Sequence, residues 1–450
     1  LLLINLFHLN PDDIANILCT TFNKMMVLVV TLADKHQACP YCGFTAPKIK
    51  EYVTKEITHS ALTTQKCIIK YRARRYKCSC CGKTYYEFNP FVFKSQKISI
   101  LTVHNILKDL KDFNETFTSV ARRYHVSPTS VSTIFDNHVD IGRNPLPEII
   151  NFDEVYAFKS EKSKYVCVLL DFKKQIPVDV LPNRKKEYLL NYFQKIPLEE
   201  RKKVKYACSD MYEVYRDVVH KVFPSCCMLL DYFHLSQDFH RKMNEVRIKV
   251  MKGYKDNKAS DEYYLLKKFN WLLFKNPEDE DKYGRLFDVE RERKYNSHFK
   301  SYMNYYDLRK KLLEINNDLT ICYSLKLELV DFYSKSTIDN AKVNLENLIR
   351  SCIDTNIDEM IAFSNNLINW KQEIINSFTI VGTEYKVEAD KGQVVVCNKK
   401  VNNAIIENRN KIIKCIKNNA NGYTNWLRFR NRVMYVLDPN ATFSLEPREK

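Results

Sequence analysis

The stretch NFDEVYAF, residues 151–158, places two neighbouring carboxylates, Asp153 and Glu154, inside an apolar and aromatic run typical of a buried strand. A carboxylate on a central strand is expensive to bury unless it is paired or binds a cation. Adjacent residues of a strand point to opposite faces, so we expect Asp153 and Glu154 to face different sides. The stretch therefore predicts a cation site on one face of a sheet.

This strand is the first of a regular series. The strand-like runs cover residues 148–158, 164–172, 176–182, 203–210 and 226–233, and helical runs cover residues 185–196 and 211–223. The order predicts a meander of three strands followed by two βαβ crossovers. The fold class that we expect is α/β, with a mixed sheet at its centre.

Two further acidic residues stand at positions that suit the same site. Asp210 ends the fourth strand-like run, where the alternative is a helix N-cap. Glu407 lies on a late helix whose face 403, 407, 411 and 414 also carries Lys411 and Lys414, and the alternative is a solvated i,i+4 pair with Lys411. Together with Asp153, these acids fit a site for two Mg²⁺ ions, and the two lysines are candidate phosphate contacts.

Two C-x-x-C-G motifs indicate a second kind of metal site. They supply Cys39 with Cys42 and Cys78 with Cys81, and the glycine after each pair suits a tight turn. Four thiolates fit a tetrahedral Zn²⁺ site, and the alternative is a set of ordinary buried or redox cysteines. Cys80 is an additional thiol that could compete as a ligand.

The segment between the two cysteine pairs is basic. Its sequence KYRARRYK, residues 70–77, carries Arg72, Arg74 and Arg75 among tyrosines. On a strand, alternate cations could follow a phosphate backbone, and a solvated hairpin face is an equally good interpretation.

Residues 116–139, TFTSVARRYHVSPTSVSTIFDNHV, have the pattern of a helix, a tight turn and a second helix. Ser127 is a suitable N-cap for the second helix, and Pro128 suits its first position. In a helix-turn-helix this second helix lies in the DNA groove, where Thr129, Ser130 and Ser132 would offer short polar groups to the bases.

The overall composition favours a polyanionic partner. The chain has 450 residues, with 71 Lys and Arg against 54 Asp and Glu, a net charge of +17. Such an excess releases counterions from nucleic acid on binding, so DNA is the leading partner. The apolar stretches 1–9 and 25–33 are much shorter than the roughly 20 residues that span a bilayer, and no basic segment of a secretory signal precedes them. We therefore expect no membrane association, a cytoplasmic location and reduced cysteines.

Taken in order, these motifs resemble a bacterial insertion-sequence transposase of the ISL-three type. The match rests on CPYCG (39–43), RRYKCSCCGKTY (74–85), NFDEVYAF (151–158), the segment 209–235 and the segment 402–433, and it covers nearly the whole chain. The resemblance implies a zinc knuckle, a helix-turn-helix and a ribonuclease-H-like DDE domain. It also implies that Asp153, Asp210 and Glu407 hold Mg²⁺ or Mn²⁺ and cleave and join DNA.

The same resemblance implies a division of the chain and a set of partners. The expected units are a zinc-knuckle domain over 1–95, a helix-turn-helix domain over 96–145, a catalytic domain over 146–234 with 396–438, and a helical insertion domain over 235–395. We expect double-stranded DNA, both element ends and target, as the partner, a homodimer when two ends are brought together, and association with the bacterial nucleoid.

Three alternatives remain at this point. Asp231, in the DYFH segment that resembles a further family signature, or Glu154 could replace Glu407 as the third ligand. A non-catalytic DNA-binding regulator would use the N-terminal motifs alone. A ribonuclease-H-like nuclease or resolvase would use the acids without joining strands.

Overall fold

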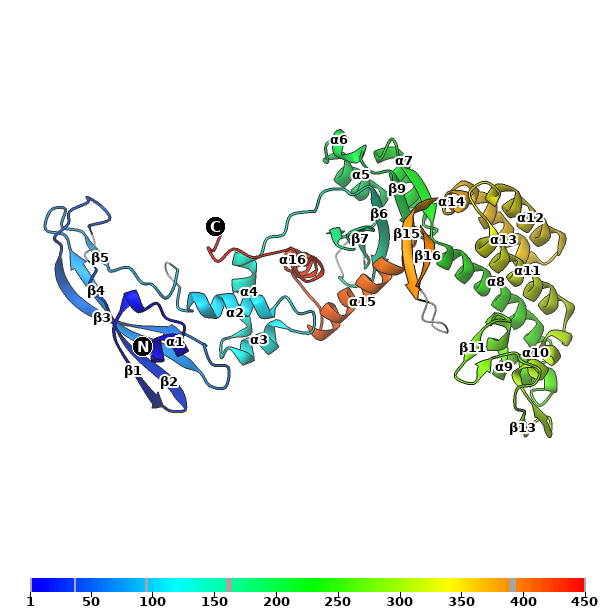
Figure 1. The fold of residues 1–450 in the computed structure, drawn as a ribbon, viewed down its shortest axis with the longest axis horizontal. Coiled ribbons are helices and arrows are strands. Elements are labelled where there is room, and N and C mark those ends of the chain that lie inside the picture. The colour runs from blue at the N-terminus through cyan, green and yellow to red at the C-terminus, as the bar shows by residue number, and fades with distance from the viewer. Residues whose placement is uncertain (1, 36–37, 94–95, 159–163, 388–393, 449–450) are drawn as a thin grey trace.

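The folded units of the protein follow one another along an elongated molecule (Figure 1). The computed structural model describes residues 2–35, 38–93, 96–158, 164–387 and 394–448. An N-terminal sheet lies at one end, three helices come next, and a central sheet connects them to a helical unit at the other end. Across these described ranges, no helix has both the length and the apolar character needed to cross a membrane.

The N-terminal sheet has five strands. They are β1 (Ile14–Phe22), β2 (Met25–Leu32), β3 (Lys48–Thr58), β4 (Cys67–Lys77) and β5 (Thr84–Tyr86). The order is β1-β2-β4-β3, and β5 pairs with the end of β4. Alternate residues of β4, among them Ile69, Tyr71 and Ala73, are buried with residues of α1 (Leu2–Leu6) and of the loop between α1 and η1 (Pro11–Asp13). The sheet therefore has a small core of its own.

The three helices after this sheet are α2 (Ile100–Asp109), α3 (Phe117–Arg123) and α4 (Pro128–His138). Ser127 caps α4 by accepting a hydrogen bond from the backbone of Ser130, and Pro128 occupies the first turn, as the sequence predicts. Val120 and Val131 pack in the core between the helices. The helix, turn and helix expected over 116–139 are thus present.

The central sheet has the predicted topology. Its strands are β6 (Ile149–Val155), β7 (Val166–Asp171), β8 (Pro177–Leu181), β9 (Tyr206–Ser209) and β10 (Cys227–Leu230), in the order β10-β9-β6-β7-β8. β6, β7 and β8 form an antiparallel meander, whereas β9 and β10 run parallel to β6. The α/β fold class and the ribonuclease-H-like mixed sheet are therefore confirmed.

Helices cover both faces of this sheet. On one face lie α5 (Lys186–Gln194), the short α6 (Leu198–Arg201) and α7 (Glu213–Val222). The other face is covered by α15 (Ala404–Asn419) and α16 (Trp426–Leu437), from the end of the chain. The side chains of α16 also reach the three N-terminal helices, since Tyr435 joins their core and Arg428 pairs with Asp136 of α4 at 2.6 Å. The last helix thus connects the three helices α2, α3 and α4 to the central sheet.

Between β10 and α15 the chain forms a largely helical unit. Its helices are α8 (Tyr232–Lys252), α9 (Asp261–Lys268), η2 (Asn270–Phe274), α10 (Tyr305–Glu314), α11 (Asn317–Lys335), α12 (Ala341–Asp354), α13 (Asp358–Asn369) and α14 (Lys371–Asn376). Three hairpins interrupt the helical pattern, namely β11 (Glu280–Asp281) with β12 (Gly284–Arg285), β13 (Lys294–Asn296) with β14 (Ser301–Met303), and β15 (Ile380–Val387) with β16 (Val394–Lys400). The last hairpin spans the expected boundary at 395, and Val381 packs against the central sheet.

Candidate active site and metal centres

Three aspartates form a row at one edge of the central sheet. The parallel register aligns Asn151 of β6 with Cys208 of β9. Two residues further along each strand stand Asp153 and Asp210. In the same way β9 and β10 end side by side, and Asp231 follows β10 next to Asp210. In-register neighbours of a parallel sheet point to the same face, so the sheet itself places three carboxylates together.

Helix α15 is fixed against this edge by asparagine side chains. The amide of Asn410 donates a hydrogen bond of 2.8 Å to Oδ2 of Asp153. At the start of the helix, Asn403 is fully buried, accepts a 2.6 Å bond from the amide of Asn151 and donates to the carbonyl of Phe152. These contacts hold the first turn of α15 on β6, although the two elements are about 250 residues apart in sequence.

Glu407 lies one turn before Asn410 and points to the same row of acids. Its Oε1 is 3.9 Å from Nε2 of His234, and the same nitrogen is 3.8 Å from Oδ2 of Asp231. Ligand atoms of Asp231, His234 and Glu407 all lie within 4.8 Å of one another. The structure therefore brings the late-helix acid to the strand-end acid Asp231, with His234 between them, whereas Asp153 and Asp210 are not members of this compact group.

The electrostatics of the row favour a bound cation. Burial, together with the nearby charge of Asp210, raises the pKa of Asp153 to about 6. Burial and the charge of Glu154 raise the pKa of Asp210 to about 6, and burial also raises the pKa of Asp231. Oδ1 of Asp210 and Oδ2 of Asp231 are buried and have no hydrogen-bond partner. Buried carboxylate oxygens without a donor are suitable ligands for a hard divalent ion, so the residues present fit Mg²⁺.

Glu154 is engaged elsewhere. Its carboxylate forms an ion pair with Arg184 and lies 3.4 Å from the hydroxyl of Tyr215 on α7, which covers the other face of the sheet. The expected opposition of Asp153 and Glu154 is therefore observed.

Asp231 and His234 are the site residues that the sequence interpretation undervalued. The sequence alone offers Asp231 only as an alternative to Glu407 for the third ligand position. The structure places Asp231 in the same row as the other two aspartates and His234 within 4 Å of two carboxylates. Their position directly after the fifth strand of the sheet is the signal from which both could have been identified.

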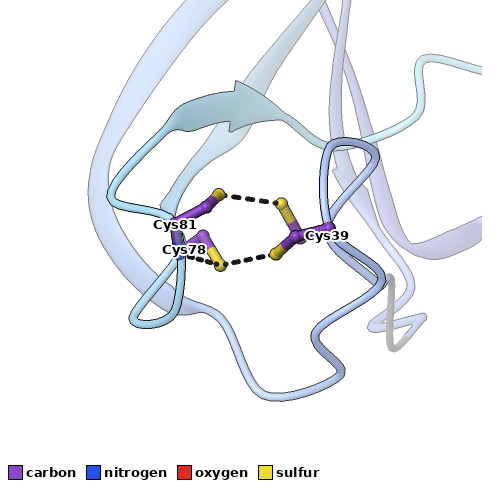
Figure 2. Close-up of side chains that lie close together, drawn as sticks. Cys39, Cys78 and Cys81 are labelled. Carbon is purple, nitrogen blue, oxygen red and sulfur yellow. Dashed lines mark hydrogen bonds between the residues drawn. The ribbon is translucent and has the colours of Figure 1, made fainter.

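The four cysteines of the two C-x-x-C-G motifs converge at the N-terminal sheet (Figure 2). The sulfurs of Cys39 and Cys81 are 3.7 Å apart, and those of Cys42 and Cys78 are 3.5 Å apart. A tetrahedral Zn²⁺ with Zn–S bonds of about 2.3 Å separates its sulfurs by about 3.8 Å. The cluster therefore has the size of a zinc site. Cys80 is exposed and does not belong to it.

The turns of this cluster also have the expected backbone. The glycines that end the two motifs, Gly43 and Gly82, have φ angles of 74° and 70°. This is a left-handed conformation that glycine adopts without strain. The backbone N–H of Cys81 points to the sulfur of Cys78 and lowers the pKa of that thiol to about 7. A lowered pKa favours the thiolate, which is the form that binds metal. At Cys42, by contrast, desolvation and the neighbouring sulfurs raise the pKa to about 12.

The candidate DNA contacts on the N-terminal sheet are not equivalent. Arg72 is exposed and lies over the ring of Tyr52. Arg74 is only 15% exposed, pairs with Glu87 at 2.8 Å and donates to two backbone carbonyls, so it does not fit a phosphate contact. Arg75 pairs with Glu51 at 2.6 Å at the surface.

Among the candidates on helices, Thr129 is exposed and Ser130 is partly exposed at the start of α4. Ser132 is buried, and its hydroxyl donates to the carbonyl of Thr129. The expectation that Ser132 reads bases therefore does not fit this structure, because the side chain faces the packed interior. Lys411 and Lys414 are exposed on α15, beyond Glu407.

Comparisons with known proteins agree with this architecture. A family model for ISL3-type transposases, described as "Transposase", matches residues 150–389, more than half of the chain. The transposase for insertion sequence element IS1001 of Bordetella parapertussis is 19% identical over 409 residues, which are 90% of each chain. The matched region contains the three strand-end aspartates and His234. The chain therefore belongs to the ISL3-type family of insertion-sequence transposases.

Proposed function

We propose that the chain is a DDE transposase that cleaves DNA strands at the ends of its element and joins them to a target. The observation that carries this proposal is the meeting of Glu407, from α15, with Asp231 and His234, at the sheet edge where Asp153 and Asp210 also stand. The separate local explanations, an N-cap for Asp210 and a surface pair for Glu407, would not require these acids to lie at one edge of the sheet. In this proposal Asp153, Asp210 and Glu407 hold Mg²⁺ or Mn²⁺.

Each reaction step is an in-line displacement at phosphorus. Bound Mg²⁺ would supply the charge that activates a water or 3′-hydroxyl and stabilises the leaving oxygen. The carboxylates of Asp153 and Asp210 present oxygens from a rigid sheet edge, and Asn410 orients the first of them. His234 presents its buried Nε2 to Asp231 and Glu407, where it would be a further ligand of the ion.

The N-terminal units supply recognition in this proposal. A Zn²⁺ held by the four clustered cysteines would stabilise the small N-terminal sheet, and Arg72 would contact the DNA backbone. Helix α4 would present Thr129 and Ser130 to base edges, with α3 as the first helix of a helix-turn-helix. Two copies would act together, one for each end of the element, on the DNA of the bacterial nucleoid.

The test is incubation of the protein with duplexes that carry the ends of its own element, with and without Mg²⁺, followed by sequencing gels. We expect metal-dependent cleavage at a fixed position and joined products. Cleavage without joining would indicate a nuclease or resolvase, and specific binding without cleavage would indicate a regulator.

The assignment of the third acid has its own test. Glu407→Gln keeps the shape of the side chain and removes its charge, so end binding should survive while cleavage falls by orders of magnitude. The matched control is Glu199→Gln, because Glu199 is 80% exposed on α6 and remote from the row of acids. Full cleavage by Glu407→Gln together with loss in Asp231→Asn would assign the role to Asp231 instead.

A further inference from the structure

A polar cavity of about 440 Å³ lies where the reading helices meet the end of α15. Its walls come from the start of α3, from the loop between α15 and α16, and from the first turn of α16. The lining contains Thr118, Arg122, Asn421, Gly422, Thr424 and Arg428. No residue of the lining is acidic. We call this space the Arg122 cavity.

The cavity carries positive charge that the protein leaves uncompensated. Arg428 is neutralised, because it makes three hydrogen bonds of 2.6–3.2 Å with Asp136. Arg122 is exposed, and no residue in the described part of the chain forms a hydrogen bond or ion pair with its guanidinium. Its neighbour Arg123, by contrast, is paired with both Asp109 and Glu115.

The loop that forms the opposite wall has a defined backbone. Asn421 and Gly422 have φ of 54° and 99°, and their backbone N–H groups bond to the carbonyls of Asn418 and Lys417 at 3.0 and 2.9 Å. A Cβ on Gly422 would meet no atom within 4 Å, so this residue opens onto free space. The exposed side chains of Asn421 and Thr424 add neutral hydrogen-bonding groups.

We propose that the Arg122 cavity binds one phosphodiester group of the DNA backbone, at the point where the duplex passes from α4 toward the row of acids. A phosphodiester is an anion with acceptor oxygens, which matches a free guanidinium, hydroxyl and amide donors and the absence of carboxylates. The inference rests on the proposed function only in that the ligand is DNA.

The position of this phosphate follows from α15. The helix runs from the central sheet toward α3 (Figure 1), with Glu407 near its start and Asn419 of the cavity at its end. Twelve residues of α-helix rise about 18 Å. One strand of duplex DNA carries a phosphate every 3.4 Å or so, so the bound phosphate should lie about five nucleotides from the bond that is cleaved. Lys411 and Lys414 are exposed between the two points, on the same stripe of the helix as Glu407.

The experiment measures binding of an element-end duplex in magnesium-free buffer, with single phosphates replaced in turn by uncharged methylphosphonates. Arg122→Gln should weaken binding about tenfold, as expected for one charged hydrogen-bonded contact, and should reduce the salt slope by about one. One replacement, about five nucleotides from the cleavage position, should weaken binding by the wild type and have no further effect on Arg122→Gln.

Two variants serve as controls. Arg122→Lys keeps the charge and should retain most of the affinity. Arg350→Gln removes an exposed arginine of α12 in the helical unit and should leave the binding unchanged. Wild-type affinity of Arg122→Gln, or identical methylphosphonate profiles for both proteins, would overturn the inference. Cleavage by the wild type is assayed separately, so failure of this inference is distinguishable from failure of the proposed function.

Discussion

Replacing Asp153 by Asn should stabilise the magnesium-free protein, although it removes a proposed metal ligand. Burial and the neighbouring Asp210 raise the pKa of Asp153 from 3.8 to about 6. At a pH above both pKa values, a shift of two pKa units lowers the free energy of unfolding by roughly 3 kcal/mol. Asp153→Asn would regain this stability, because Asn carries no charge. Part of this gain is lost, because Asn410 would donate to a neutral amide oxygen instead of a carboxylate. We expect a net gain of about 2 kcal/mol at pH 8.

The sign of the pH dependence follows from the raised pKa. Below about pH 4 Asp153 is protonated in the folded state and largely protonated in the unfolded state, so it has little effect on stability. Between about pH 4 and 6 the unfolded state loses its proton first, and the native protein loses stability as the pH rises. The advantage of Asp153→Asn should therefore be present at pH 8 and fall below about 1 kcal/mol near pH 4.

Differential scanning calorimetry can measure this effect. The transition to follow is the one that Mg²⁺ shifts in the wild type, and a gain of about 2 kcal/mol would raise its midpoint by roughly 4–8 °C. Magnesium should stabilise the wild type and have little effect on Asp153→Asn. The control is Asp217→Asn, since Lys186 lowers the pKa of Asp217, which makes the expected change a small loss of stability. A lower midpoint for Asp153→Asn at pH 8, or a gain that persists at pH 4, would refute this account of the row of acids.

Three further results are expected. Elemental analysis should find about one zinc per chain in the wild type and in Cys80→Ser, and a large loss in Cys78→Ser; equal zinc in all three proteins would contradict the cysteine site. Thr129→Ala should reduce the preference for element-end DNA over random DNA in competition binding, whereas Ser132→Ala, at a buried position, should leave this preference unchanged. Asn410→Ala should reduce metal-dependent cleavage about 10- to 100-fold with end binding retained, and unaltered cleavage rates would show that the amide does not orient the first-strand acid.

Local patterns in the sequence were sufficient for much of the fold. The apolar run around Asp153 and the alternation of strands with helices predicted the mixed sheet, because hydrophobic periodicity reports which face of each element is buried. The paired C-x-x-C-G motifs predicted the convergence of four sulfurs, since both halves need only a tight turn. Ser127 and Pro128 likewise marked the start of α4 from local capping rules.

Only the tertiary structure shows which side chains come together at the site and which are buried in internal hydrogen bonds. Only the packing of α15 against the central sheet places Glu407 beside His234 and Asp231, which are far away in sequence. Arg74 and Ser132 look like surface residues in a basic strand and a polar helix, yet the structure buries them in hydrogen bonds. Hydrophobic periodicity indicates which face of a helix or strand is buried. Strand register and the packing of distant segments depend on long-range contacts, which no local pattern contains.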